Sequence, residues 1–254
     1  MGKKKEKKES FSLFQFLFGS LTVDIIIALN TAVFYFMYYT PNGREYLQPF
    51  IMYPGNLING KVWCVITSGF IHGSLSHFLW NMLGVFIFGK IVEKKLGVRK
   101  TLFIYFGALT ISMLFSTAVY AFLLNKNVAI IGASGAVMGL ISGAMLLAPF
   151  TVTYEMILPI PTMVKGWMFF YADIQGFLNQ ASDGVSHLAH IFGFLSIAIL
   201  VYFLSYKDKK AIKVGMAINI FSIVMLLLLN HWLSKNMHWN ILPDGVIQQT
   251  TNII

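Results

Sequence analysis

Three short segments of the sequence combine the residue types that acyl-transfer chemistry uses. Residues 132–135 (Gly-Ala-Ser-Gly) place the hydroxyl of Ser134 between glycines, His190 supplies an imidazole, and His77 and Asn81 stand four residues apart. A serine hydroxyl is a weak nucleophile until a base takes its proton, and the ordinary pKa of histidine suits that task. We therefore predict Ser134 as a nucleophile and His190 as its base, with His77 and Asn81 as hydrogen-bond donors to an oxyanion.

Each of these clusters lies at the start of an apolar segment. The length of each segment is close to the roughly 20 residues that a helix needs to cross a bilayer. At 1.5 Å of rise per residue, the clusters of the second, fourth and sixth segments lie at similar depth, within roughly 10 Å of one membrane surface. The fifth segment is the weakest, because it contains two prolines and a lysine. The seven predicted segments are 21–39, 75–91, 102–124, 134–149, 156–174, 187–206 and 212–233.

The composition places the whole chain in a membrane. Of its 254 residues, 57% are hydrophobic and only 11% are charged, against roughly 25% charged residues in soluble domains. This excludes a cytosolic enzyme, a disulfide-rich secreted module and a disordered chain. The single cysteine, Cys64, excludes an internal disulfide. We predict an all-α polytopic membrane protein whose partners include membrane lipid.

The basic residues indicate an orientation. The net charge of +9 comes from lysines and arginines that fall between apolar runs, which favours a topology signal over nucleic-acid binding. With a cytosolic N-terminus, fourteen basic residues lie on the cytosolic side and four on the far side. The predicted site then opens toward the outer face, and without an organelle signal we expect the plasma membrane.

Other interpretations of the same residues stay open at this point. A serine at the start of a helix is commonly an N-cap. The spacing of Gly135, Gly139 and Gly143 is typical of close helix packing in membranes, and we assign that role to Gly139 and Gly143. Histidines at one depth also suit a metal or haem site. These histidines are His72, His77, His187 and His190.

The ordered motifs resemble those of the rhomboid family of intramembrane serine proteases, from about residue 63 to 206. Residues 77–81 (His-Phe-Leu-Trp-Asn) resemble the His-x-x-x-Asn of the family's second helix, and residues 93–97 (Glu-Lys-Lys-Leu-Gly) resemble the segment that closes it. Residues 132–135 fit the Gly-x-Ser-Gly motif, and residues 189–193 (Ala-His-Ile-Phe-Gly) fit Ala-His-x-x-Gly. All of these motifs occur in the family's order.

The resemblance implies a Ser134–His190 dyad without a catalytic aspartate, and no metal or other cofactor. His77, Asn81 and the backbone at Ala133 and Ser134 would form the oxyanion site. The implied fold is a six-helix bundle with an appended seventh transmembrane helix. The first loop, residues 40–74, is apolar, so we expect it to pack against the bundle or to dip into the membrane interface. The resemblance implies that this loop lies sideways in the membrane and that residues 175–185 cap the site. The implied division of the chain is a basic tail (1–20), a protease core (21–206) and an additional helix with an outer tail (207–254).

Three positions depart from the family pattern, and none of them removes a reacting group. Cys64 follows Trp63 where many members have arginine, Met138 replaces a tyrosine, and Ile197 replaces a glycine. We therefore expect a serine endopeptidase that hydrolyses peptide bonds in or near transmembrane segments of membrane-protein substrates. The alternatives are a haem- or metal-binding membrane protein and a catalytically inactive rhomboid-like binder of membrane helices. The sequence alone indicates no oligomeric state.

Overall fold

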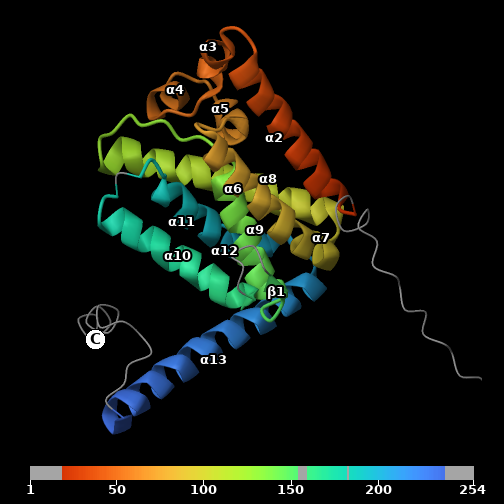
Figure 1. The fold of residues 1–254 in the computed structure, drawn as a ribbon, viewed down its shortest axis with the longest axis vertical. Coiled ribbons are helices and arrows are strands. Elements are labelled where there is room, and N and C mark those ends of the chain that lie inside the picture. Colours follow the sequence, from red (N-terminus) through yellow and green to blue (C-terminus); the bar gives the residue numbers. More distant parts are fainter. Residues whose placement is uncertain (1–18, 154–158, 182, 238–254) are drawn as a thin grey trace, which may run out of the picture.

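The computed structural model describes residues 19–153, 159–181 and 183–237, and it is mostly helical (Figure 1). Four of its helices are long and apolar enough to cross a membrane, and their ranges are Leu21–Tyr39, Leu75–Leu96, Val98–Leu123 and Tyr206–Asn236. Two further apolar helices, Ser134–Leu147 and His187–Phe203, are shorter. A helical membrane protein is thus confirmed. The count of six plus one transmembrane helices stays a prediction.

After the first loop most connections are short, and the one between η4 and α9 covers residues 124–133. The α-helices and the two strands are joined by two π-helical segments, η3 and η4, and three 3₁₀ turns. In chain order the elements are α2 (Leu21–Tyr39), α3 (Gly43–Leu47), η1 (Gln48–Phe50), α4 (Pro54–Ile58), α5 (Cys64–Thr67), η2 (Ser68–Phe70), α6 (Leu75–Gly84), η3 (Val85–Gly89), α7 (Lys90–Leu96), α8 (Val98–Ala118), η4 (Val119–Leu123), α9 (Ser134–Leu147), β1 (Val152–Thr153), β2 (Ile160–Pro161), α10 (Thr162–Leu178), α11 (His187–Leu195), α12 (Ile197–Leu200), η5 (Val201–Phe203) and α13 (Tyr206–Met237).

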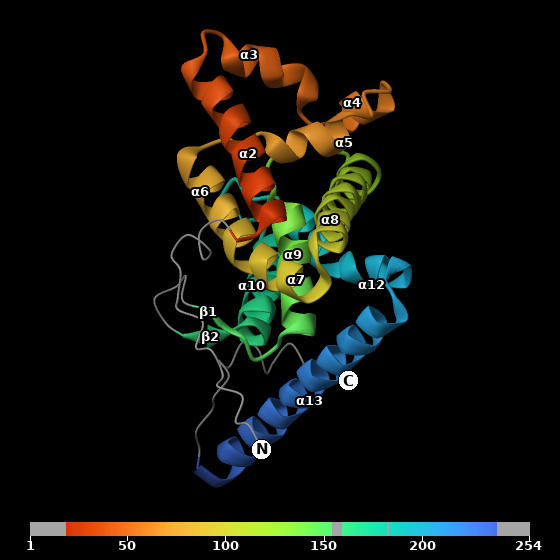
Figure 2. The same ribbon diagram turned by 90° about the vertical axis from the view of Figure 1, so that its right-hand side faces the viewer.

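Helix α9 is the centre of the bundle in both views (Figures 1 and 2). All of its residues from Gly135 to Leu146 are buried. Glycines allow its neighbours to approach this closely, because a Cβ on Gly139 would lie 2.3 Å from the Cβ of Ala108 in α8. A Cβ on Gly193 in α11 would lie 2.2 Å from the carbonyl oxygen of Gly135. This confirms the packing role of Gly139. At Gly143 a Cβ would make only an ordinary contact, 3.5 Å from Val92.

The first loop packs against the bundle, as its apolar composition predicts. Met52, Cys64 and Ser68 are completely buried. The short helices α3, α4 and α5 lie at the end of the bundle away from α13 (Figure 2).

Two predicted boundaries around the fifth segment are wrong. Helix α10 begins at Thr162, directly after Pro161, and continues to Leu178. Proline lacks an amide hydrogen and fixes φ, so it is well suited to the position just before a helix. Here Ile160 and Pro161 pair with β1 instead of opening the helix. The predicted cap, 175–185, therefore overlaps the last turn of α10, and the true connection to α11 is residues 179–186.

Helix α13 begins beside the bundle and extends away from it (Figures 1 and 2). Gly215 lies against the carbonyl of Leu146 at the end of α9, where no side chain would fit. The Asn219 amide donates to the carbonyl of Met145 at 3.2 Å and accepts from the indole of Trp167 at 3.0 Å. The predicted tail 1–20, except for residues 19 and 20, and residues 238–254 lie outside the described residues.

Candidate active site

The structure brings the predicted site residues to one cavity of about 1060 Å³. Ser134, His190, His77 and Asn81 all line it. They come from three helices, α6, α9 and α11, and they span more than a hundred residues of sequence, from His77 to His190. The remaining predicted residue, Ala133, is completely buried beside Ser134.

Ser134 is the first residue of α9, and Ala133 holds the N-cap position without a side-chain cap. The first turn's backbone bond runs from the Val137 amide to the Ala133 carbonyl at 2.9 Å. The first amides of a helix lack intrahelical partners and carry partial positive charge. The amide of Ser134 is therefore available to a negative charge that develops next to its side chain.

The Ala133 amide has a different partner. It donates to Nε2 of His72 over a long 3.4 Å. His72 is completely buried, and burial, followed by the charge of His77, lowers its pKa to about 3. A neutral His72 can accept this hydrogen bond, whereas a charged one cannot. In this structure the Ala133 amide is thus directed toward His72, and the oxyanion role of Ala133 stays a prediction.

Gly132 places His77 and Asn81 beside the nucleophile. Its φ is +99°, a conformation that side chains other than glycine rarely adopt. A Cβ on Gly132 would lie 2.5 Å from Nε2 of His77 and 3.6 Å from Nδ2 of Asn81. Asn81 also donates to the His77 carbonyl at 2.9 Å, which fixes its amide on the helix. Both donors thus lie beside Gly132, which precedes Ser134 by two residues in the sequence.

A contact missed by the sequence analysis holds the segment before Ser134. The hydroxyl of Ser68, completely buried, donates to the carbonyl of Ile130 and accepts from the amide of Met52. The Ser68 carbonyl accepts from the Gly132 amide at 3.0 Å. The first loop is therefore bonded directly to the turn that presents Ser134. A serine in a loop gives no sequence signal for this role.

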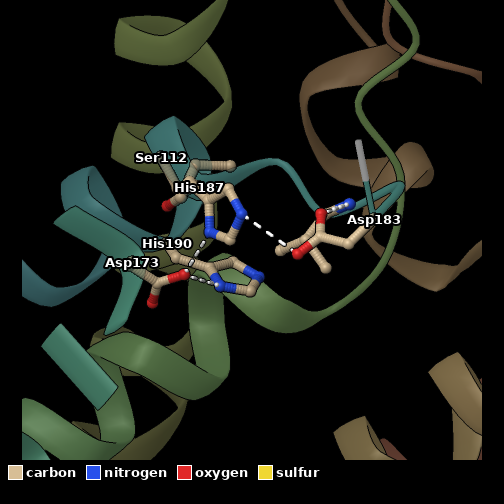
Figure 3. A network of polar contacts seen from close by, with 7 residues as sticks. Ser112, Asp173, Asp183, His187 and His190 are labelled. Atoms are coloured by element: carbon tan, nitrogen blue, oxygen red, sulfur yellow. Dashed lines mark hydrogen bonds and ion pairs between the residues drawn. The ribbon is translucent and has the colours of Figure 1, made fainter. Parts of the chain in front are cut away.

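A second missed residue is Asp173 in α10, which faces two histidines of α11 (Figure 3). Its Oδ1 lies 2.8 Å from Nδ1 of His190 and 2.9 Å from Nδ1 of His187. Nε2 of His187 lies 3.3 Å from Oδ2 of Asp183. An acidic residue inside an apolar helix was the available signal, since such residues are costly in a membrane.

His190 lines the cavity and forms its side-chain hydrogen bond through Nδ1, so its other ring nitrogen, Nε2, is not used in that bond. Among the described residues, its ring is bonded through Nδ1 to Asp173, and no hydrogen bond joins it to Ser134. Catalytic hydrogen bonds are often long before substrate binds and tighten afterwards. The pairing of Ser134 with His190 therefore stays a prediction.

The four histidines considered for a metal or haem form two pairs. The rings of His72 and His77 lie 5.0 Å apart, and those of His187 and His190 lie 6.3 Å apart. Within ranges 19–153, 159–181 and 183–237, no group of three or more His, Cys, Asp or Glu residues is arranged to hold a metal ion.

Comparison with known proteins supports the motifs. The Rhomboid domain family matches residues 59–207. The Arabidopsis thaliana protein named "RHOMBOID-like protein 12, mitochondrial" is 26% identical over 69% of this chain and 57% of its own length. The Bacillus subtilis protein named "Putative rhomboid protease YdcA" is 29% identical over 60% of this chain and 71% of its own. A third relative, "Inactive RHOMBOID-like protein 8" of Arabidopsis, is 28% identical over 60% of this chain and 35% of its own.

These names correct the predicted location. Relatives named as mitochondrial, among them the first Arabidopsis protein, contradict the plasma membrane. The expectation failed because it was only a default for a chain without a visible organelle signal. A multi-pass membrane protein agrees with the apolar helices. The side on which the N-terminus lies stays a prediction.

The family match covers more than half of the chain and includes every predicted site residue. The matched region also contains the glycine contacts that bring α8, α9 and α11 together. The chain therefore belongs to the rhomboid family.

Proposed function

We propose that this protein is an intramembrane serine protease in which Ser134 is the nucleophile and His190 the base. The observation that carries the proposal is the shared cavity: Ser134 and His190 line it together with His77 and Asn81. Ser134 also begins a helix, so its own backbone amide is available to the oxyanion that forms when Ser134 attacks a carbonyl carbon. The substrates are membrane proteins cleaved in or near a transmembrane segment.

The reaction has two halves. Ser134 Oγ attacks a substrate carbonyl carbon while Nε2 of His190 takes the hydroxyl proton. The C–N bond then breaks, and His190 gives that proton to the leaving amine. A water molecule attacks the resulting ester with His190 again as base, which releases the new carboxyl group and restores Ser134. His77, Asn81 and the Ser134 amide stabilise the oxyanion in both halves.

The backbone structure of a transmembrane substrate limits where it can be cleaved. A helical substrate shields its carbonyl groups inside its own hydrogen bonds, so the segment must unwind before Ser134 reaches one. Residues that favour non-helical backbone, such as glycine and proline, lower that cost. We therefore expect cleavage near helix-weakening residues of the substrate.

Cleavage of a transmembrane substrate by purified protein in liposomes tests the proposal, with a fluorophosphonate probe of the serine in parallel. The wild type should cleave and be labelled, and Ser134→Ala should do neither. Ser142→Ala is the matched control, since Ser142 lies in the same helix, buried and outside the cavity. Full cleavage by Ser134→Ala would overturn the assignment. Folded wild-type protein that is neither active nor labelled would instead match the relative named inactive.

A further inference from the structure

One carboxylate oxygen of Asp173 contacts two imidazoles. Oδ1 lies 2.8 Å from Nδ1 of His190 and 2.9 Å from Nδ1 of His187 (Figure 3). The Asp173 side chain is only 9% exposed. A buried carboxylate needs hydrogen-bond donors to be stable, and these two rings provide them.

The chemistry of the contact fixes which nitrogen of His190 carries the proton. An ionised carboxylate only accepts hydrogen bonds, so Nδ1 of His190 must be the donor. In neutral histidine the other nitrogen, Nε2, then has a free lone pair. That nitrogen is on the side of the ring away from Asp173, and the ring lines the cavity that contains Ser134.

We propose that Asp173 is a positioning residue for His190, so that the site works as a Ser134–His190–Asp173 arrangement and not as a dyad. The inference rests on the function proposed above. Asp173 holds the ring in the tautomer that accepts the Ser134 proton, and it stabilises the positive charge that His190 then carries. The sequence resemblance implied no such aspartate.

His187 contacts the same carboxylate oxygen as His190. Its ring packs directly on Gly176 of α10, where a Cβ would lie 2.3 Å from the ring. Its Nδ1 bonds Asp173, and its Nε2 lies 3.3 Å from Asp183 in the connection to α11. Two residues of α11 therefore hold the Asp173 carboxylate. One of them, His187, also lies close to Asp183, which lines the cavity.

The test compares Asp173→Asn, Asp173→Ala and Asp173→Glu with the wild type in liposomes. Rates are measured per folded protein, taken from the monodisperse fraction of gel filtration. We expect kcat to fall on the order of 10²-fold or more in Asp173→Asn with KM unchanged, because the amide can donate to Nδ1 and favour the wrong tautomer. Asp173→Glu, which keeps a carboxylate, should recover more activity than Asp173→Asn.

Asp208→Asn is the matched control. The Asp208 side chain is also 9% exposed and ion-paired, to Lys100, but it lies outside the cavity. It should keep the wild-type kcat even where it lowers the melting temperature. Wild-type kcat in folded Asp173→Asn or Asp173→Ala would overturn this inference. The Ser134→Ala variant, assayed alongside, separates that outcome from failure of the proposed protease function.

Discussion

Gly132 is in direct contact with His77: a Cβ on Gly132 would lie 2.5 Å from Nε2 of His77. The contact joins the turn before Ser134 to the start of α6. It also explains why a glycine is needed there beyond its φ of +99°. The donors of the proposed oxyanion site are therefore set by the backbone of the nucleophile turn.

Gly132→Ala should lower kcat on the order of 10²-fold, because the methyl group displaces an oxyanion donor. Gly60→Ala is the matched control. Gly60 has a φ of +80° but nothing within 4 Å of its Cβ position, so it tests backbone strain without the contact. Strain alone costs about 1 kcal/mol. The measurement is the cleavage rate together with the melting temperature. Equal activity of the two variants would show that His77 tolerates the methyl group.

Asn81→Ala should reduce kcat on the order of 10²-fold with little change in KM, because it removes a donor to the oxyanion. Asn30→Ala is a close control. Asn30 in α2 makes the same type of bond, from its amide to the carbonyl four residues earlier, at 2.8 Å. It does not line the cavity. If both variants lost activity equally, the effect of Asn81 would be structural, and its role in the oxyanion site would be rejected.

Part of the fold and of the candidate site could be predicted from the sequence. The bounds of α2 coincide with the predicted 21–39, because a mainly apolar run ends before Thr40 and Pro41. The start of α9 at Ser134 follows from the glycine that precedes it. Both features are local, so hydrophobicity and backbone preference suffice to locate them.

Other features depend on contacts between distant segments. The start of α10 depends on Ile160 and Pro161 pairing with β1. The role of Asp173 depends on α10 packing against α11, and that of Ser68 on a loop that folds back to residue 130. No spacing in the sequence encodes these distances, since each joins elements whose relative position is set by packing.

Ser68→Ala should lower stability by about 1–3 kcal/mol, because it leaves the buried Met52 amide and Ile130 carbonyl without a partner. Cleavage should slow as well, since the segment leading to Ser134 loses its tie to the first loop. Thr67→Ala removes a neighbouring hydroxyl that bonds the Phe50 carbonyl at 2.9 Å instead. Thermal unfolding and cleavage rates should therefore separate the two variants. A Ser68→Ala protein as active as Thr67→Ala would contradict this role.

Acid should destabilise the protein through His72. Burial lowers its pKa from 6.5 to about 3 in the folded state. Between these values the unfolded chain binds a proton that the folded chain does not, so stability is complete above pH 6.5 and falls as the pH drops toward 3. The slope is on the order of 1 kcal/mol per pH unit. Melting temperatures from pH 7 to pH 4 measure it.

His72→Gln provides the comparison for this pH dependence. The side-chain oxygen of glutamine can accept from the Ala133 amide, as Nε2 of His72 does, but it does not titrate. The variant should therefore lose less stability than the wild type between pH 6.5 and pH 4, whatever its stability at pH 7. Parallel curves for the two proteins would mean that His72 is accessible to protons in the folded state. The Ala133 amide would then need another acceptor, and the turn before Ser134 would not depend on a neutral histidine.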